Sequence, residues 1–368
     1  MKDIFDALVP DYIKTLNAYE PGKPVEEVKR ELGIKSCIKM ASNENPLGPS
    51  PLAMRSIAAS AKKAHFYPEG DCFYLRQKAI KQFGVKSEEL LFGNGSNELI
   101  ELLIRCLVRR DDNIVISQHA FLVYRLVAQG VGAVVREAPA KNYGHDLDAM
   151  AALVNDRTRL VFIANPNNPT GTYNDKDSLV RFLKKVPNVP VIMDEAYYEY
   201  AGAKDYPQTM ELRKQFPNIF ILRTFSKIYG LAGLRIGYGI GDPSIVQYLN
   251  RLRQPFNVNL VAQNAALAAL GDTAHMKKSL KANRDGKKFL YSRLKKEGIE
   301  FLPTEANFIL LKVGKGREVF QAMMRLGVVV RPMDAYGLPE FIRVTVDKEA
   351  NNRRFMSALL KSLGRRSK

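Results

Sequence analysis

The sequence predicts an α/β fold in which a mainly parallel sheet is covered by helices on both faces. Short, nearly continuous apolar runs recur at Asn113–Ser117, residues 160–164, Val191–Asp194 and residues 219–222. Segments with apolar residues at helical spacing separate these runs. Strands that are apolar throughout and alternate with helices are typical of parallel sheets buried between two helical layers.

The chain length predicts more than one domain, because 368 residues exceed what a single core of ordinary size holds. Residues 1–49 are polar and turn-rich, with one helix expected over Val25–Leu32, and are predicted to form an N-terminal arm and active-site loop. A large cofactor-binding domain is expected over residues 50–255, including a helix over 97–110. Residues 256–368, with helical sequence to about residue 297 and then three strand candidates, are expected to form a smaller α+β domain.

The formal net charge of +18 is compatible with a nucleic-acid partner, with steering of anionic small molecules, or with a generally basic surface. The basic residues are dispersed and accompany no nucleic-acid motif, so the third explanation is favoured and no nucleic-acid partner is expected. No apolar run is long enough to span a bilayer, and no membrane association is expected. Three scattered cysteines disfavour disulfides and structural zinc and suit the cytoplasm. The four histidines lack metal-ligand spacing, so no metal is expected.

Polar residues that can perform chemistry follow three of the predicted strands. Asp194 ends one strand, the run 165–171 follows another, and Lys227 follows the third. Ligands in open parallel sheets bind beyond the carboxyl ends of the strands. A lone lysine or aspartate is usually a surface charge or a helix cap, but this coincidence suits an amine that forms a Schiff base with an anionic, nitrogen-containing cofactor. The sequence therefore indicates pyridoxal 5'-phosphate, with Asp194 paired to its ring nitrogen.

A glycine-containing loop, Gly93-Asn94-Gly95-Ser96-Asn97-Glu98, precedes the helix predicted over 97–110. Glycine lets the backbone approach an anion, and the helix N-terminus supplies free N–H groups. Glu98 breaks the GxGxxG dinucleotide fingerprint, and the loop lacks the GK[ST] ending of a Walker A motif. A plain glycine turn would explain the loop equally well. As a phosphate site, it would be completed by Ser226 and Arg235.

Three further side chains are candidates for contact with a cofactor or a substrate. Phe121 follows a predicted strand, where its ring could stack on a cofactor or simply belong to the core. Arg343 stands in an apolar strand, and because a buried arginine needs a partner, a substrate carboxylate is one candidate. Arg331 invites the same argument less strongly.

Taken together, these motifs resemble the fold-type I aminotransferases and, within them, the histidinol-phosphate aminotransferase family. The resemblance covers nearly the whole chain. Its most specific parts are residues 41–51, 67–70, 93–99, 165–171, 194–197, 224–227 and 331–346. It departs from the family pattern at His119-Ala120-Phe121, where Pro-Thr precedes the aromatic residue in most members, at Glu69 and at Asp347. None of these departures removes a catalytic group.

The resemblance implies a role for each candidate residue. Lys227 would be the Schiff-base lysine and proton shuttle, Asp194 would pair with the pyridine nitrogen, and Asn168 and Tyr197 would hold the ring oxygen. Phe121 would stack on the ring. The phosphate would be held by Gly95, Ser96, Asn97, Ser226 and Arg235, and by Tyr67 of a partner subunit. The substrate would be bound by Tyr19, Asn45, Arg331 and Arg343, with Arg343 on the carboxylate of the amino donor.

The activity that the resemblance implies is transamination of L-histidinol phosphate with 2-oxoglutarate, giving imidazole acetol phosphate and glutamate in histidine biosynthesis. The family also implies a homodimer with shared active sites. Aromatic amino-acid transamination and threonine-phosphate decarboxylation remain alternatives, because fold does not determine substrate. A nicotinamide-dependent oxidoreductase is disfavoured by the broken glycine fingerprint.

Overall fold

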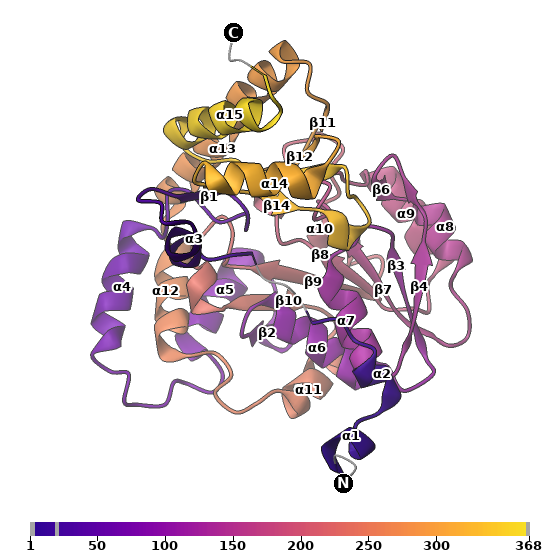
Figure 1. Cartoon of the computed structure of the whole chain (residues 1–368). Coiled ribbons are helices and arrows are strands. Elements are labelled where there is room, and N and C mark those ends of the chain that lie inside the picture. Colours follow the sequence, from indigo (N-terminus) through magenta and orange to yellow (C-terminus); the bar gives the residue numbers. More distant parts are fainter. Residues whose placement is uncertain (1–3, 19–21, 366–368) are drawn as a thin grey trace.

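The structure is a computed structural model that describes residues 4–18 and 22–365. A large sheet lies between two layers of helices, and a smaller domain covers one end of it (Figure 1). The predicted α/β fold is confirmed. No helix in the described ranges combines the length and apolar character that a bilayer crossing requires.

The large sheet has seven strands in the order β2-β10-β9-β8-β7-β3-β4. Its strands are β2 (Leu90–Gly93), β10 (Gly237–Ile240), β9 (Ile219–Thr224), β8 (Val191–Asp194), β7 (Thr158–Ala164), β3 (Asn113–Ser117) and β4 (Val134–Ala138). β10 is antiparallel to both its neighbours, and the remaining pairs are parallel. The four strands predicted from the apolar runs are thus the central strands β3, β7, β8 and β9.

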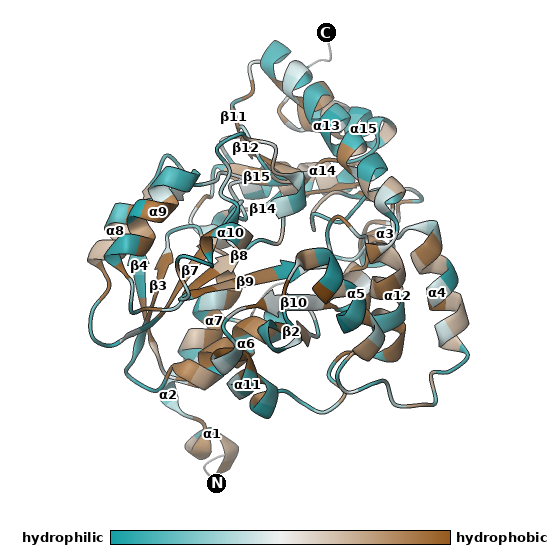
Figure 2. Ribbon diagram, turned by 180° about the vertical axis from the view of Figure 1, so that it is seen from behind, coloured by the Kyte–Doolittle hydropathy of each residue, from teal (hydrophilic) through white to brown (hydrophobic). Residues whose placement is uncertain are grey.

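Both faces of this sheet are buried, as alternate residues of one strand show. In β7, Val161 and Ile163 face one apolar cluster, whereas Leu160 and Phe162 face another. The first cluster lies under α4 (Pro51–Ala61), α5 (Phe73–Phe83), α8 (Leu147–Ala152), α9 (Lys176–Lys185), α10 (Thr209–Leu212) and α12 (Leu260–Leu270). The second lies under α6 (Ser96–Leu107), α7 (Leu122–Gly130) and α11 (Pro243–Leu252). The apolar strands accordingly lie between helices with hydrophilic outer turns (Figure 2).

The small domain is built on an antiparallel sheet in the order β11-β12-β15-β14. Its elements are β11 (Phe301–Leu302), β12 (Phe308–Lys312), β14 (Arg331–Pro332), β15 (Phe341–Thr345), α13 (Thr273–Lys296), α14 (Gly316–Arg325) and α15 (Glu349–Ser362). One of the three strand candidates, residues 328–330, coincides with β13 (Val328–Val329), and β14 begins just beyond it. The remaining short elements are α1 (Ile4–Leu8), α2 (Asp11–Lys14), β5 (Ala140–Lys141) and β6 (Gly144–His145).

Part of the predicted arm packs on the small domain. β1 (Ile38–Lys39) runs parallel to β13, and Val28 of α3 (Val25–Leu32) packs with Ala41 and Val329. The segment that follows β1 is therefore carried over the end of the large sheet by the small domain.

The predicted boundary at residue 255 lies just before α12. Ala262, Ala265 and Ala266 of α12 are fully buried in the cluster beneath the large sheet. α13 packs against that cluster near its start, at Leu280, and enters the small-domain core at Leu290. The chain thus crosses between the domains within α13. Sequence periodicity reveals that a helix is buried, but it does not reveal which core buries it.

Candidate active site

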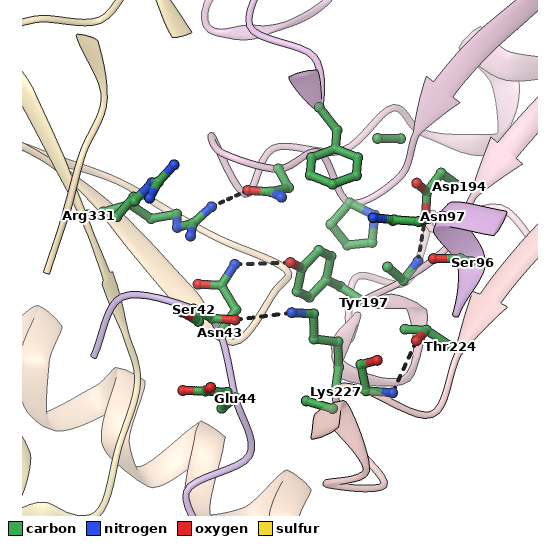
Figure 3. Close-up of a pocket in the computed structure, with 18 of the residues that line it drawn as sticks. Ser42, Asn43, Glu44, Ser96, Asn97, Asp194, Tyr197, Thr224, Lys227 and Arg331 are labelled. Carbon is green, nitrogen blue, oxygen red and sulfur yellow. Dashed lines mark hydrogen bonds between the residues drawn. The ribbon is translucent and has the colours of Figure 1, made fainter. Parts of the chain in front are cut away.

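A cavity of about 280 Å³ opens beyond the carboxyl ends of β7, β8 and β9, where the small domain faces the large sheet (Figure 3). Residues 41–44 cross it from the small-domain side. The cavity brings together most of the residues that the sequence singled out. These are Ser96, Asn97, Phe121, Asn168, Asp194, Tyr197, Ser226, Lys227, Arg235, Arg331 and Arg343.

Lys227 lies just beyond β9, and its Nζ donates a hydrogen bond to the Ser42 carbonyl at 3.1 Å (Figure 3). Burial, and then the positive charge of Arg343, lower the pKa of this amine to about 8. Glu44 opposes that shift, while Arg235 and Lys39 add to it. Because the neutral amine is the nucleophile and the base, the cavity makes Lys227 far more reactive near neutral pH than an ordinary lysine.

We expect the ligand-free protein to capture an aromatic aldehyde at Lys227 with a rate that rises to a plateau through about pH 8. At pH 7 a lysine with that pKa has roughly 10²-fold more neutral amine than one with the ordinary value. Borohydride trapping between pH 6 and 11, followed by peptide mass analysis, measures the rate at Lys227. Arg343→Met should move the midpoint upward. A wild-type midpoint near 10.5 would contradict the lowered pKa.

Asp194 is only 6% exposed at the end of β8. Its carboxylate accepts hydrogen bonds from the Tyr124 hydroxyl at 2.5 Å and from the Ala196 N–H at 3.2 Å. Burial raises the pKa of this carboxyl group, although both hydrogen bonds act in the opposite direction. A buried carboxylate facing a cavity is stabilised by a cationic partner there, such as a protonated ring nitrogen.

Two amide side chains lie on the other side of Lys227. Asn43 Nδ2 donates to the Tyr197 hydroxyl at 2.9 Å. Arg343 donates to Asn168 Oδ1 and, through its other terminal nitrogen, to the Ala41 carbonyl at 2.8 Å. With Oδ1 of Asn168 engaged by Arg343, the NH₂ group of that amide remains a donor. Burial raises the pKa of Tyr197, so its hydroxyl keeps its proton and can also donate.

The end of the cavity near α6 is a cradle for an anion. Gly95 precedes the helix with φ +78°, and a Cβ there would come within 2.6 Å of the Arg235 guanidinium. A Cβ on Gly237 would come equally close to the backbone nitrogen of Ser96. Two glycines therefore keep the start of α6 accessible beside a cation, with the Ser226 hydroxyl adjacent. This donor set suits a phosphate group.

Arg331 and Arg343 stand opposite each other on β14 and β15. Both contribute to the cavity, and Arg331 also lines a larger outer cavity of about 980 Å³. Like charges directly opposite across a sheet repel, so anions bound beside these guanidinium groups are favoured. His119 and Tyr336 line the outer cavity as well, and the His119 ring donates from Nδ1 to the Tyr336 carbonyl at 2.6 Å.

Three predicted site residues are not among those that line the cavity. The Asn45 side chain donates to the Ile228 carbonyl at 2.7 Å and to Ser279 at 2.9 Å, so it braces the fold and does not face a substrate. Tyr67 is 82% exposed and stacks on Phe256. Gly95 contributes through its backbone conformation. Tyr19 lies outside the described residues.

The structure also brings in residues that the sequence did not single out, among them Ser42, Asn43, Glu44, Tyr124, Thr224 and Tyr336. Tyr124 had a usable signal, because it lies in the first turn of α7, three residues after the Phe121 that precedes this helix. Asn43 lies in the segment 41–51 of the family resemblance, but nothing local pairs it with Tyr197, which it meets across 154 residues of sequence.

Comparison with known proteins agrees with this geometry. Residues 35–359 match the family model described as aminotransferase class I and II. The chain is 48% identical to the histidinol-phosphate aminotransferase of Moorella thermoacetica, over 94% of this chain and 91% of that protein. It is 46% identical to that of an Anaeromyxobacter species, over 97% and 99%. It also resembles the crystal structure of histidinol-phosphate aminotransferase from Sinorhizobium meliloti in complex with pyridoxal-5'-phosphate. That match has a TM-score of 0.89 and 25% identity, and covers 97% of this chain and 98% of the other.

Proposed function

The chain belongs to the class I and II aminotransferases, and from this premise we propose that it transfers the amino group of L-histidinol phosphate to 2-oxoglutarate by means of pyridoxal 5'-phosphate. The products are imidazole acetol phosphate and glutamate. The observation that carries the proposal is Lys227, an amine whose pKa is lowered to about 8 at the centre of a cavity with an anion cradle and a buried acid. The two relatives at 46–48% identity carry the name of this activity.

The donor groups of the cavity fit this cofactor. Gly95, Ser96, Ser226 and Arg235 form the cradle for its phosphate. Asp194 would hold a proton on its ring nitrogen, while Tyr197 and Asn168 would donate to its ring oxygen. When bound, the cofactor supplies an electron sink for the carbon from which a proton is removed.

Lys227 serves first as the attachment point and then as the base. When neutral, its Nζ would be the base that moves a proton at the substrate carbon. A pKa of about 8 suits both directions of transfer near neutral pH. The second substrate is processed by the same steps in reverse, so ping-pong kinetics are expected.

The paired arginines support a substrate with an anionic group at a distance from the reacting amine. Arg343, held by Asn168 and Ala41 beside the cavity, is assigned to the carboxylate of glutamate. Arg331, which lines both the inner and outer cavities, is assigned to the phosphate of histidinol phosphate. A guanidinium binds either group through paired hydrogen bonds.

The function is tested by spectroscopy and by substrate comparison. The purified protein should absorb near the visible edge, and borohydride should fix the cofactor on Lys227. With 2-oxoglutarate as acceptor, kcat/KM for histidinol phosphate should exceed that for phenylalanine and tyrosine. Equal turnover of the aromatic acids would replace the proposal with an aromatic aminotransferase. Release of carbon dioxide from phosphothreonine would replace it with the decarboxylase.

Arg331→Ala should lower kcat/KM for histidinol phosphate by about 10- to 100-fold, the worth of a hydrogen-bonded charge pair. It should leave kcat/KM for histidinol, which has no phosphate, nearly unchanged. Arg317→Ala is a matched control, because Arg317 also lines the outer cavity but pairs with Asp334. An equal loss for both substrates would remove Arg331 from phosphate binding.

We further propose that the chain forms a homodimer whose subunits share their active sites. We also propose that this dimer resides in the cytoplasm. Several large aromatic side chains near one another in sequence or in space are exposed, namely Phe66, Tyr67, Phe73, Tyr74 and Phe256. Exposed apolar patches of this kind are typical of protein interfaces. The free thiols of the three cysteines suit a reducing compartment.

If each active site contains residues of both subunits, two different defective subunits should complement each other in a mixed dimer. Tyr67→Ala should weaken cofactor binding about tenfold if its hydroxyl bonds the partner's phosphate group. Mixing Tyr67→Ala subunits with inactive Lys227→Ala subunits should then raise activity, because one of the two mixed sites has both residues intact. Tyr248→Ala is the control. Tyr248 is also an exposed tyrosine but lies on α11, and its replacement should show no such gain. Absence of complementation in a verified mixed dimer would place Tyr67 outside the partner's site.

A further inference from the structure

We infer that Asn43 is a positioning residue whose side-chain amide aims the Tyr197 hydroxyl proton at the ring oxygen of the cofactor. The inference rests on the proposed function and adds to it the residue that sets the direction of this hydrogen bond. It also links the small domain to the cofactor, because Asn43 lies on the segment that the small domain carries.

The direction of this contact agrees with the other hydrogen bonds around Asn43. The Thr345 hydroxyl accepts the backbone N–H of Asn43 at 2.9 Å and donates its own proton to Asn43 Oδ1 at 3.4 Å. With Oδ1 turned toward Thr345, Nδ2 is turned toward the Tyr197 hydroxyl at 2.9 Å (Figure 3). The amide therefore donates, and the phenol oxygen accepts.

The consequence concerns the remaining proton of the phenol. A tyrosine hydroxyl has one proton and two acceptor sites, and Asn43 uses an acceptor site. Among the hydrogen bonds of residues 4–18 and 22–365, the Tyr197 hydroxyl takes part only as the acceptor from Asn43. Because Tyr197 lines the cavity, that proton is directed to a group bound there. If the amide were reversed, Asn43 would accept the proton and the cofactor would lose the donor that Tyr197 supplies.

Asn43 is held rigidly enough for this task. It is 1% exposed and has a left-handed backbone with φ +57°, a conformation that asparagine tolerates better than most residues. The Asn307 side chain donates to its carbonyl at 3.0 Å. Thr345 lies in β15 and Asn307 precedes β12, so both anchors belong to the small domain. A shift of the small domain would therefore change the orientation of the Tyr197 hydroxyl.

The test uses the absorbance of the cofactor-loaded protein during a pH titration. The titrating group is the nitrogen that joins the cofactor to Lys227. A hydrogen-bond donor at the ring oxygen stabilises the negative charge of that oxygen most when this nitrogen carries no proton. Loss of the donor therefore raises the midpoint of the titration. Asn43→Asp keeps the size and the left-handed backbone but accepts the Tyr197 proton. It should raise the midpoint by about one pH unit, the scale of a hydrogen bond to a charged group. Asn43→Gly should raise it less, because Tyr197 then remains free to donate.

A double-mutant cycle isolates the part of the shift that passes through Tyr197. Combined with Tyr197→Phe, Asn43→Asp should add only the small direct effect of its charge, so the two shifts are not additive. Asn45→Asp is the matched control, since Asn45 is also a buried amide of this segment but bonds Ile228 and Ser279. It should lower thermal stability and leave the midpoint unchanged.

Additive shifts, or an unchanged midpoint in Asn43→Asp, would overturn the inference while the proposed function stands. A wild-type protein that takes up no cofactor would overturn both.

Discussion

Lys227→Ala should lower kcat by at least about 10⁴-fold, because it removes both the attachment of the cofactor and the base that moves the proton. Cofactor binding should survive in weaker, non-covalent form, since the anion cradle near Arg235 and the acid Asp194 remain. Steady-state kinetics and equilibrium dialysis measure the two effects separately. Because the contacts of the anion cradle and of Asp194 remain, an added alkylamine can take the place of the missing amine. We expect it to restore part of the activity.

Lys287→Ala is the control for this variant. Lys287 is also a partly buried lysine whose pKa is lowered by desolvation, but its amine donates to the Thr304 carbonyl and does not line the cavity. The variant should lose thermal stability and keep its kcat. Full activity in Lys227→Ala, or an equal loss in Lys287→Ala, would contradict the assignment of Lys227.

Asp194→Asn should lower kcat by about 10²- to 10³-fold, the equivalent of losing one partner of a buried charge pair. The amide keeps the size of the side chain but cannot hold a proton on the ring nitrogen. Tyr124→Phe, which removes the hydroxyl that donates to Asp194 at 2.5 Å, should cost far less because the carboxylate stays. Equal losses in the two variants would assign the effect to packing.

Asp194→Asn should raise the stability of the ligand-free protein, although it lowers kcat. Burial raises the folded-state pKa of Asp194 above its unfolded value, so at neutral pH the ligand-free protein is destabilised by this charge. Asp194→Asn should therefore raise the Tm of the ligand-free protein and reduce the further rise produced by the cofactor. Thermal denaturation at pH 7 with and without cofactor measures both. A lower Tm in the ligand-free variant would mean that Asp194 is already paired in the folded protein.

Local patterns in the sequence predicted the secondary structure and identified the chemical groups. Apolar runs at β3, β7, β8 and β9 predicted buried strands, because a strand covered on both faces must be apolar throughout. Glycine at position 95 and the acid at position 194 were recognisable because a helix start and a strand end are local features. The family resemblance then implied the roles of Lys227 and Arg343.

Which distant segments are in contact became known only from the tertiary structure. It assigned α12 to the core of the large domain, took Asn45 out of the substrate site, and placed Asn43 against Tyr197. Periodicity indicates that a face is buried, and a motif indicates what chemistry a side chain can perform. Neither indicates which residue the face or the side chain will contact. The hydrogen bond that aims Tyr197 depends on the small domain and the large sheet together, and therefore exists only in the folded chain.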